Sequence, residues 1–432
     1  MKNIFDKIKK DLFASDFRKN VLTLLSATVI SQALPIITSP LYLRIYKPEE
    51  LGLYALFLSI CGFIFPLATG SYDSAIMLPK DDKDSLNIMI LVIMINFIVC
   101  IIFFLTFIFW GNYLLNLLKI EKLKNWLFII PIILVLTVIN QCFNYWYNRK
   151  KKYKIISTGK IMTSVIVVFL GLFLGLLGFR EKGLIFSYIV GQISVFILFF
   201  FKFEDCGILK INELKIKNVL EQAKIYQNFP KYTLPQSFID SVRENGIIFI
   251  ISRFFGTAEI GFYSYALKVI KTPLNLIGSS ISQVFYQHAT SLKNNNINIW
   301  PLIKNTIKHL SFIAFPILLS ILFFGPAIFS WIFGKNWLQA GIYSQIIISG
   351  VVILFIASSI STIPQIFGRQ KTFMLMSIFY SIIIITGFYL FAVLLNNMKY
   401  SLGYLVTLNL IYGIIFLFWI KILCNKQEMV KK

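Results

Sequence analysis

Long, mostly apolar stretches recur from one end of this chain to the other. Each is about eighteen residues or longer, the length that a helix needs to cross the hydrocarbon core of a membrane. We place them at about residues 20–43, 51–72, 86–109, 126–147, 155–178, 183–201, 230–255, 260–287, 309–333, 342–365, 372–395 and 401–423. The connections between them are too short for a soluble domain. The sequence therefore predicts an all-α polytopic membrane protein with about twelve transmembrane helices.

The net charge of +23 is distributed unevenly among the loops. A charge of this size can indicate nucleic-acid binding, but lysine and arginine concentrate at both chain ends and in alternate loops, at residues 2–19, 149–154, 202–231 and 421–432. The intervening loops hold few of them. By the positive-inside rule this asymmetry places both termini in the cytoplasm. We therefore expect a multi-pass protein of the cytoplasmic (inner) membrane that does not bind nucleic acid.

A short segment of the first half returns in the second half. Residues 44–54 read RIYKPEELGLY and residues 253–263 read RFFGTAEIGFY, with identities at Arg44/Arg253, Glu50/Glu259, Gly52/Gly261 and Tyr54/Tyr263. Both segments follow the first span of a six-span half, and six is even, so the halves have the same orientation. We therefore expect two six-helix lobes related by a parallel pseudo-two-fold repeat. The N-terminal lobe covers 1–201 with an amphipathic leader, a cytoplasmic linker covers 202–229, and the C-terminal lobe covers 230–432.

Three cations lie within predicted spans, near the middle of the membrane. Arg243 belongs to the seventh span, and Lys268 and Lys271 belong to the eighth. A cation at this depth costs about 2.5–3.5 kcal/mol on insertion scales, so it normally faces a partner or an aqueous cavity. Asp240 and Glu244 can neutralise only part of the charge. Shifting by 209 residues places no charge at the equivalent positions of the first half, so we expect intramembrane cations in the second lobe alone and an anion as their ligand.

Two alternatives stay open at this point. The cations and acids can form a self-neutralising structural network, and small polar residues in membrane helices often do no more than join neighbouring helices. The polar residues nevertheless follow steps of three and four, which places them on one face of each helix. On the eighth span this stripe comprises Ser264, Lys268, Lys271, Asn275, Ser279 and Ser282, and the first span carries a milder stripe of Thr28, Ser31, Gln32, Pro35, Ser39 and Tyr42.

Two segments carry a resemblance to a known family: SQALPIITSPLYLRIYKPEELGLYALFLS over the first two spans and SYDSAIMLPKDD after them. They resemble the bacterial O-antigen and polysaccharide flippases, the polysaccharide-transport branch of the multidrug/oligosaccharidyl-lipid/polysaccharide exporter superfamily. The resemblance implies two lobes of six helices each. It also implies transport of an undecaprenyl-pyrophosphate-linked oligosaccharide, such as the O-antigen repeat unit of lipopolysaccharide biosynthesis. Movement from the cytoplasmic to the periplasmic leaflet would occur by alternating access.

The residues assign roles consistent with this resemblance. A pyrophosphate diester carries about two negative charges, for which lysine and arginine are natural ligands. We therefore expect Arg243, Lys268 and Lys271 to bind it, with Asp240 and Glu244 orienting them. For the glycan, hydrogen bonds and stacking surfaces are available, if these residues face the cavity, from Gln32, Asn140, Gln141, Asn144, Tyr42 and Tyr46. The expected partners are the lipid-linked oligosaccharide, membrane lipids and other polysaccharide-assembly proteins.

The sequence offers no catalytic or metal-binding motif, and we expect no cofactor. A coupling ion, either a proton or sodium, can use Asp73, Asp240 or Glu244. The rival functions are a multidrug exporter, a peptidoglycan-precursor flippase, and a membrane enzyme such as an O-antigen polymerase or glycosyltransferase. A drug exporter would present acidic groups to organic cations, whereas this cluster is net positive. The longest outward loop, at about 110–125, holds Glu121 as its single acid, so we expect no enzyme.

Overall fold

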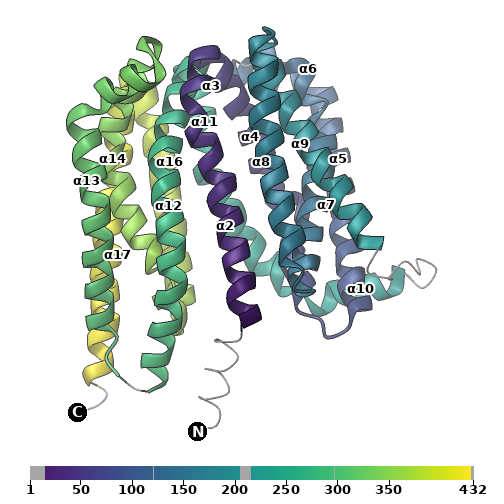
Figure 1. Cartoon of the computed structure of the whole chain (residues 1–432), viewed down its shortest axis with the longest axis vertical. Coiled ribbons are helices and arrows are strands. Elements are labelled where there is room, and N and C mark those ends of the chain that lie inside the picture. Colours follow the sequence, from purple (N-terminus) through teal and green to yellow (C-terminus); the bar gives the residue numbers. More distant parts are fainter. Residues whose placement is uncertain (1–14, 120, 205–215, 296, 430–432) are drawn as a thin grey trace. The chain divides into compact units, whose positions relative to one another are not determined.

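The computed structural model describes residues 15–119, 121–204, 216–295 and 297–429 (Figure 1). Over these residues the chain is all-α, and twelve of its helices are at least twenty residues long: α2 (Ser15–Ile37), α4 (Pro48–Thr69), α5 (Asp82–Leu118), α7 (Ile130–Arg149), α8 (Tyr153–Leu176), α9 (Arg180–Glu204), α11 (Leu234–Phe254), α12 (Thr257–Asn294), α13 (Trp300–Phe333), α14 (Leu338–Ser359), α16 (Gln370–Leu395) and α17 (Met398–Met429). Shorter elements connect them: α3 (Ser39–Ile45), α6 (Lys124–Leu127), α10 (Ile216–Ile225), α15 (Ile363–Ile366), the 3-10 helices η1 (Tyr72–Met77), η2 (Glu121–Leu123) and η5 (Lys335–Trp337), and the π-helix η4 (Phe229–Thr233). The predicted fold class is confirmed.

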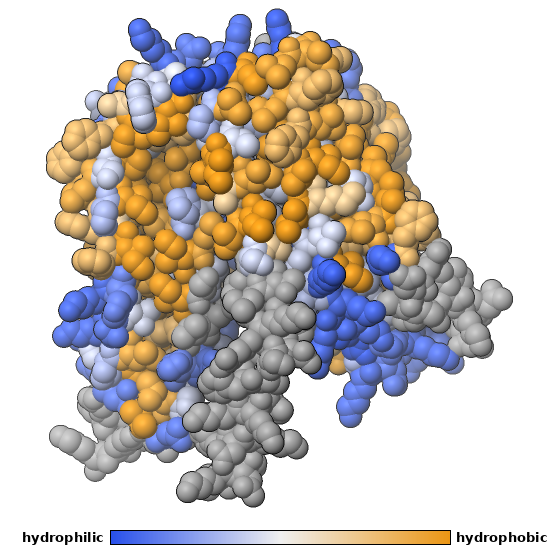
Figure 2. Space-filling model, in the orientation of Figure 1, coloured by the Kyte–Doolittle hydropathy of each residue, from blue (hydrophilic) through white to orange (hydrophobic). Residues whose placement is uncertain are grey.

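Nine helical segments of the described chain are long and apolar enough to cross a membrane. Figure 2 shows apolar side chains over the middle of the visible face and hydrophilic ones toward its two ends. Large apolar side chains on these helices are exposed, such as Phe312 at 81% and Trp331 at 82%. Such a belt is expected where lipid rather than water contacts the protein. α11 and α12 are also long enough to span, but they are not among the nine because they carry the predicted charges and polar stripes.

The chain divides into two compact units. The first comprises residues 1–45 and 57–238, and the second comprises residues 46–56 and 239–432. The lobe boundaries expected from the sequence stay a prediction. The described part of the predicted linker includes α10, which belongs to the first unit and packs on α5, with Val219 in the core. Most of the predicted amphipathic leader lies outside the described residues.

The first unit is built around paired helices. α2 packs on α8, α8 on α9, and α5 on α7. Its core is rich in aromatic residues, with Trp146, Tyr147 and Phe199 almost fully buried. The predicted first span, 20–43, is broken between α2 and α3, where the Thr38 hydroxyl donates to the Leu34 carbonyl oxygen at 2.8 Å. Pro40, at the start of α3, lacks the N–H that would continue the helix.

In the second unit, α14 packs against α12, α13 and α17, and α16 packs against α17. The internal repeat is visible in the backbone of the chain. Two residues, Tyr46 and Lys47, separate the end of α3 from the start of α4. Two residues, Phe255 and Gly256, likewise separate α11 from α12, and the helix starts Pro48 and Thr257 are 209 residues apart.

Gly52 and Gly261 meet in this unit. A Cβ atom added to Gly52 would overlap the Thr257 carbonyl oxygen and lie 3.0 Å from the Gly261 nitrogen, while one added to Gly261 would overlap the Pro48 carbonyl oxygen. Each glycine therefore contacts the repeat equivalent of its own helix start. Small residues allow membrane helices to approach this closely. The two contacts are related by the local two-fold symmetry of the repeat. Both positions require glycine, because any side chain would overlap a backbone carbonyl oxygen.

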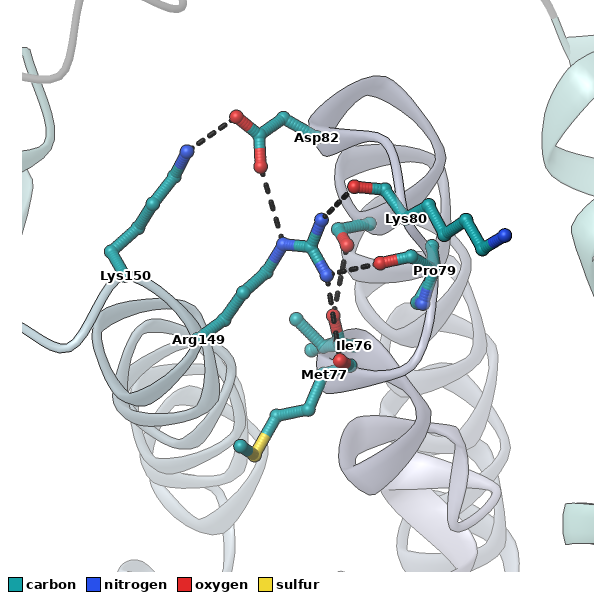
Figure 3. Close-up of polar contacts among 8 residues, drawn as sticks. Ile76, Met77, Pro79, Lys80, Asp82, Arg149 and Lys150 are labelled. Carbon is teal, nitrogen blue, oxygen red and sulfur yellow. Dashed lines mark hydrogen bonds and ion pairs between the residues drawn. The ribbon is translucent and has the colours of Figure 1, made fainter. Parts of the chain in front are cut away.

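A basic residue at the end of α7 closes the loop between η1 and α5 (Figure 3). The Arg149 guanidinium donates to the carbonyl oxygens of Pro79 and, at 2.8 Å, Lys80, and its Nε lies 3.2 Å from Asp82 Oδ1. Lys150 pairs with the other oxygen of Asp82. The planar guanidinium suits several acceptors at once. Arg149 thus joins the loop to α7.

We expect Arg149→Lys to lower the free energy of unfolding by about 1–3 kcal/mol, because an ammonium cannot reproduce the fork of hydrogen bonds. Thermal unfolding of the purified protein in detergent measures the change. The matched control is Lys150→Ala, which removes the more exposed of the two cations that pair with Asp82 and should cost less than about 1 kcal/mol. An unchanged free energy of unfolding in Arg149→Lys would show that Arg149 contributes charge alone, because lysine keeps the charge and loses the fork of hydrogen bonds.

Candidate functional site

Arg243 and Asp240 of α11 lie against α16 in the second unit. Arg243 Nη2 is 3.1 Å from Asp240 Oδ1, one helical turn earlier. Its Nη1 donates to the hydroxyl oxygens of Ser377 and Ser381 at 3.4 and 3.2 Å. The Tyr380 ring centroid lies 5.6 Å from the guanidinium carbon. Arg243 is therefore held in a polar cradle in which Asp240 supplies the counter-charge.

α17 contacts the helix that carries the partners of Arg243, α16. Ser377, Tyr380 and Ser381 share one face of α16 because they are three and four residues apart. The Tyr380 hydroxyl donates to Asn409 Oδ1 at 2.5 Å, and its ring stacks on Tyr412 with centroids 4.1 Å apart. These contacts orient the face of α16 that receives Arg243.

The two lysines of α12 are placed differently from Arg243. Lys268 and Lys271 are exposed, as are Asn275 and Ser279 farther along the helix. Lys268 lies over the Tyr265 ring at 5.2 Å. Lys271 is within electrostatic range of Glu244 and Arg243. Among the described residues, neither lysine has a carboxylate at ion-pair distance.

This exposed stripe is at a depth where lipid cannot solvate it. Lys268 and Lys271 lie eleven and fourteen residues into α12, or about 17 and 21 Å from its start. Polar groups at that depth face other protein or water rather than lipid. The three mid-membrane cations Arg243, Lys268 and Lys271 outnumber the two acids Asp240 and Glu244, which leaves one net positive charge among these five residues. The structural-network alternative describes Arg243 in part, but not the two lysines.

Of the residues predicted to contact the glycan, Gln32, Asn140 and Asn144 belong to the first unit. Gln32 is exposed on α2, and Asn144 is half-buried on α7. Asn140 is buried and donates to the side chain of Gln192 on α9 at 3.0 Å, so it joins two helices. Contact of Gln32 and Asn144 with substrate stays a prediction.

The expectation that Tyr42 and Tyr46 offer stacking surfaces to a glycan is wrong. They are only 7% and 2% exposed. The Tyr42 hydroxyl donates to the carbonyl oxygens of Val167 and Val168 at 2.8 and 2.9 Å, where Gly171 leaves room for the ring. Tyr42 therefore anchors α3 to α8.

The expectation that intramembrane cations occur in the second lobe alone is also wrong. Lys160 lies seven residues into the apolar span Tyr153–Leu176 of the first unit. Its side chain is exposed, and its Nζ donates to the Thr28 hydroxyl at 3.3 Å. Lys160 could have been recognised from the sequence as a lysine inside an apolar stretch. It is close to the basic loop at residues 149–154, however, and is easily counted with the lysines of that loop.

The three candidate coupling acids have different surroundings. Asp73 is buried in η1, where the side chains of Thr69 and Gln141 contact its carboxylate, and burial raises the pKa of this carboxyl above its ordinary value. Asp240 pairs with Arg243, and Glu244 is exposed. Within the part of the chain that the structure describes, no group of three or more acidic, histidine or cysteine residues could hold a metal ion.

Comparisons with known proteins agree with this architecture. Residues 42–342, more than half of the chain, match the family described as "Polysaccharide biosynthesis protein". The teichuronic acid biosynthesis protein TuaB of Bacillus subtilis (strain 168) is 25% identical over 121 residues, which cover 28% of this chain and 25% of TuaB. The chain thus matches about a quarter of the length of that relative.

Solved structures of transporters share the fold. The lipid II flippase MurJ in an inward closed conformation has a TM-score of 0.75 at 16% identity, covering 94% of this chain and 90% of MurJ. An inward-facing multidrug resistance MATE family transporter of the MOP superfamily has a TM-score of 0.72 at 13% identity, covering 95% and 99%. A MOP superfamily transporter from Pyrococcus furiosus Vc1 (DSM3638) has a TM-score of 0.58 at 11% identity, covering 95% and 96%. The protein is a member of the polysaccharide biosynthesis protein family with the two-lobe fold of the MOP-superfamily transporters.

Proposed function

We propose that this protein is a flippase for an undecaprenyl-pyrophosphate-linked oligosaccharide, the O-antigen repeat unit or a similar glycan. It moves this substrate unchanged from the cytoplasmic to the periplasmic leaflet by alternating access. The observation that carries the proposal is the exposed cationic stripe of α12, with Lys268 and Lys271 unpaired among the described residues at membrane depth. A diphosphate group is an anion of matching charge, and membership of a family described as polysaccharide biosynthesis proteins supports a glycan-bearing substrate.

In this proposal each charged residue has a role. Lys268 and Lys271 bind the pyrophosphate directly, and Arg243 joins them by exchanging its contact with Asp240 for one with a phosphate oxygen. Glu244, close to Lys271, limits the local positive charge so that the product can leave. Gln32 and Asn144 are proposed to contact the glycan. The polyprenyl tail stays in the lipid, which needs no dedicated pocket.

The second candidate is another transporter of the same fold. The description of the Pyrococcus furiosus transporter attributes reversed pocket polarity and a different function to that protein, so charge alone does not select a cargo within this fold. A multidrug exporter for organic cations fits the present cluster poorly because its net charge is positive. A lipid II flippase has the same fold, and a lipid-linked peptidoglycan precursor is therefore the closer rival.

The proposal includes the membrane and the driving force. Both termini lie on the cytoplasmic side of the inner membrane in this proposal, which the lysine and arginine asymmetry of the loops supports. A proton or sodium ion drives transport through Asp73, Asp240 or Glu244, and no resident cofactor takes part. Other polysaccharide-assembly proteins are the proposed protein partners.

Transport without chemistry is testable with purified protein in liposomes. A polyprenyl-pyrophosphate oligosaccharide placed in one leaflet should become accessible in the other, and its mass should not change. Lys271→Ala protein reconstituted at the same density is the control and should be inactive. Glycan transfer or hydrolysis that depends on this chain would refute the proposal. Equal transport of a peptidoglycan precursor would favour the rival cargo.

A further inference from the structure

The cation of the first unit has a polar neighbourhood of its own. α2 and α8 lie side by side and run in the same direction (Figure 1). Lys160 Nζ on α8 contacts Thr28 Oγ1 on α2, and four residues later the Ser164 hydroxyl donates to the Ser31 carbonyl oxygen at 2.7 Å. Gln32, one turn beyond Thr28, is exposed. Hydroxyl, amide and ammonium groups thus occur together where α2 and α8 pack.

The side chain of Lys160 is not merely extended toward the membrane surface. Lysines near a helix end commonly reach back to the headgroups. The contact between Ser164 on α8 and Ser31 on α2 shows which residues of the two helices lie at the same depth. Because the helices run in the same direction, Lys160, four residues before Ser164, lies at about the depth of residue 27, four residues before Ser31. Thr28 is one residue deeper than that level. The ammonium is therefore held at about the depth of its own Cα atom, roughly 10 Å from the start of α8 at Tyr153.

Most of the hydrogen-bond donors of the Lys160 ammonium remain available to a ligand. An ammonium has three N–H donors, and the contact with Thr28 uses one. Among the described residues no carboxylate is at ion-pair distance from Lys160. An exposed, unneutralised cation inside an apolar span is costly to insert and normally marks a functional site. Its chemistry selects an anion with several acceptor oxygens.

We infer that Lys160 and the Thr28 hydroxyl form a second phosphate-binding site, located in the first unit, for the pyrophosphate of the lipid-linked substrate. The site lies within the leaflet at the basic end of α8, the leaflet from which the substrate is taken if the proposed function holds. Lys160 supplies the charge, and Thr28 both holds the ammonium and can donate to a phosphate oxygen. Phosphate recognition is then shared by both units and is not confined to α11 and α12.

Binding of undecaprenyl pyrophosphate to the full-length protein in phosphatidylcholine nanodiscs tests this site. Lys160→Met keeps the length and apolar stem of the side chain, and it should weaken binding about tenfold through loss of a charge-assisted contact. Lys160→Arg should stay within about threefold of the parent, because a guanidinium also binds phosphate. Thr28→Val should lose about two- to threefold and Thr28→Ser should lose none. The matched control is Lys154→Ala, an exposed lysine in the first turn of the same helix.

A parallel titration with phosphatidylglycerol separates the substrate from an ordinary lipid headgroup. The inference requires that Lys160→Met leave phosphatidylglycerol binding unchanged. It is overturned if Lys160→Met binds undecaprenyl pyrophosphate like the parent, or if it loses both ligands equally. Should Lys160→Met fold poorly, the Thr28→Val and Thr28→Ser pair decides the question, and equal binding by these two variants overturns the inference.

The same assay distinguishes this inference from the proposed function. If Arg243→Ala and Lys271→Ala bind normally while Lys160→Met does not, the second-unit site is wrong and the first-unit site stands. If only the second-unit variants lose binding, the inference about Lys160 is wrong and the proposed function stands.

Discussion

Cells that carry Lys271→Ala should lose surface polysaccharide while the variant protein still inserts and accumulates. Lys271 makes no ion pair among the described residues, so its removal leaves no carboxylate without a partner. The neutral side chain is also easier to insert than the cation. Loss of one or two charge-assisted contacts to a diphosphate should reduce transport about a hundredfold. Immunoblots of surface polysaccharide and of membrane-inserted protein measure the two quantities separately.

Three further variants define what this result means. Lys271→Arg should retain part of the activity, since either cation can bind a phosphate with different geometry. Arg243→Ala should also abolish export, although it leaves Asp240 without its counter-charge and is the less selective test. Lys304→Ala removes an exposed lysine in the first turns of α13 and should export normally. Normal export by Lys271→Ala and Arg243→Ala would show that these cations do not bind the substrate.

Gly52→Ala and Gly261→Ala should each destabilise the protein by about 1–3 kcal/mol, because the added methyl group overlaps a backbone carbonyl oxygen of the facing helix. Backbone cannot move aside as a flexible side chain can, so the starts of α4 and α12 must separate. The two substitutions force the same separation. The double variant should therefore cost less than the sum of the two single variants. Thermal unfolding of purified protein in detergent gives all three values.

Gly403→Ala is the matched control for these glycines. Gly403 also lies within a long helix, α17, but a Cβ atom there meets no neighbour within 4 Å. Alanine should be neutral there, or stabilising by up to about 1 kcal/mol, because it favours the helix more than glycine does. Additive costs at Gly52 and Gly261 would mean that the two positions do not share one contact. Wild-type stability of both single variants would mean that the helices do not approach closely.

The positions of the long helices were predictable because apolarity and length are local properties of the sequence. The span expected at 372–395 is α16, Gln370–Leu395, and the span expected at 155–178 is α8, Tyr153–Leu176. Deviations occur where a helix continues past the hydrocarbon core, as in α5, or where a proline interrupts it, as at Pro40. The 209-residue repeat was also readable, because equivalent segments begin and end helices at equivalent positions.

The charges of the site were predictable as residues but not as contacts. An isolated cation in an apolar stretch indicates function whatever its partners are, which is why Arg243, Lys268 and Lys271 stood out. Lys160 met the same criterion and was missed beside its basic loop. The partners Ser377 and Ser381 lie more than 130 residues from Arg243, and no periodicity within α11 indicates which helix will face it.

The sequence by itself determined the class of protein, the number of long helices and the repeat, since each depends on composition or spacing along one segment. The tertiary structure alone decided which polar residues meet. It buried Tyr42 against α8, placed Thr28 beside Lys160, and brought Gly52 and Gly261 into mutual contact. The physical reason is that these contacts depend on the packing register between helices distant in sequence, and small residues and backbone approach set that register without leaving a pattern in either segment.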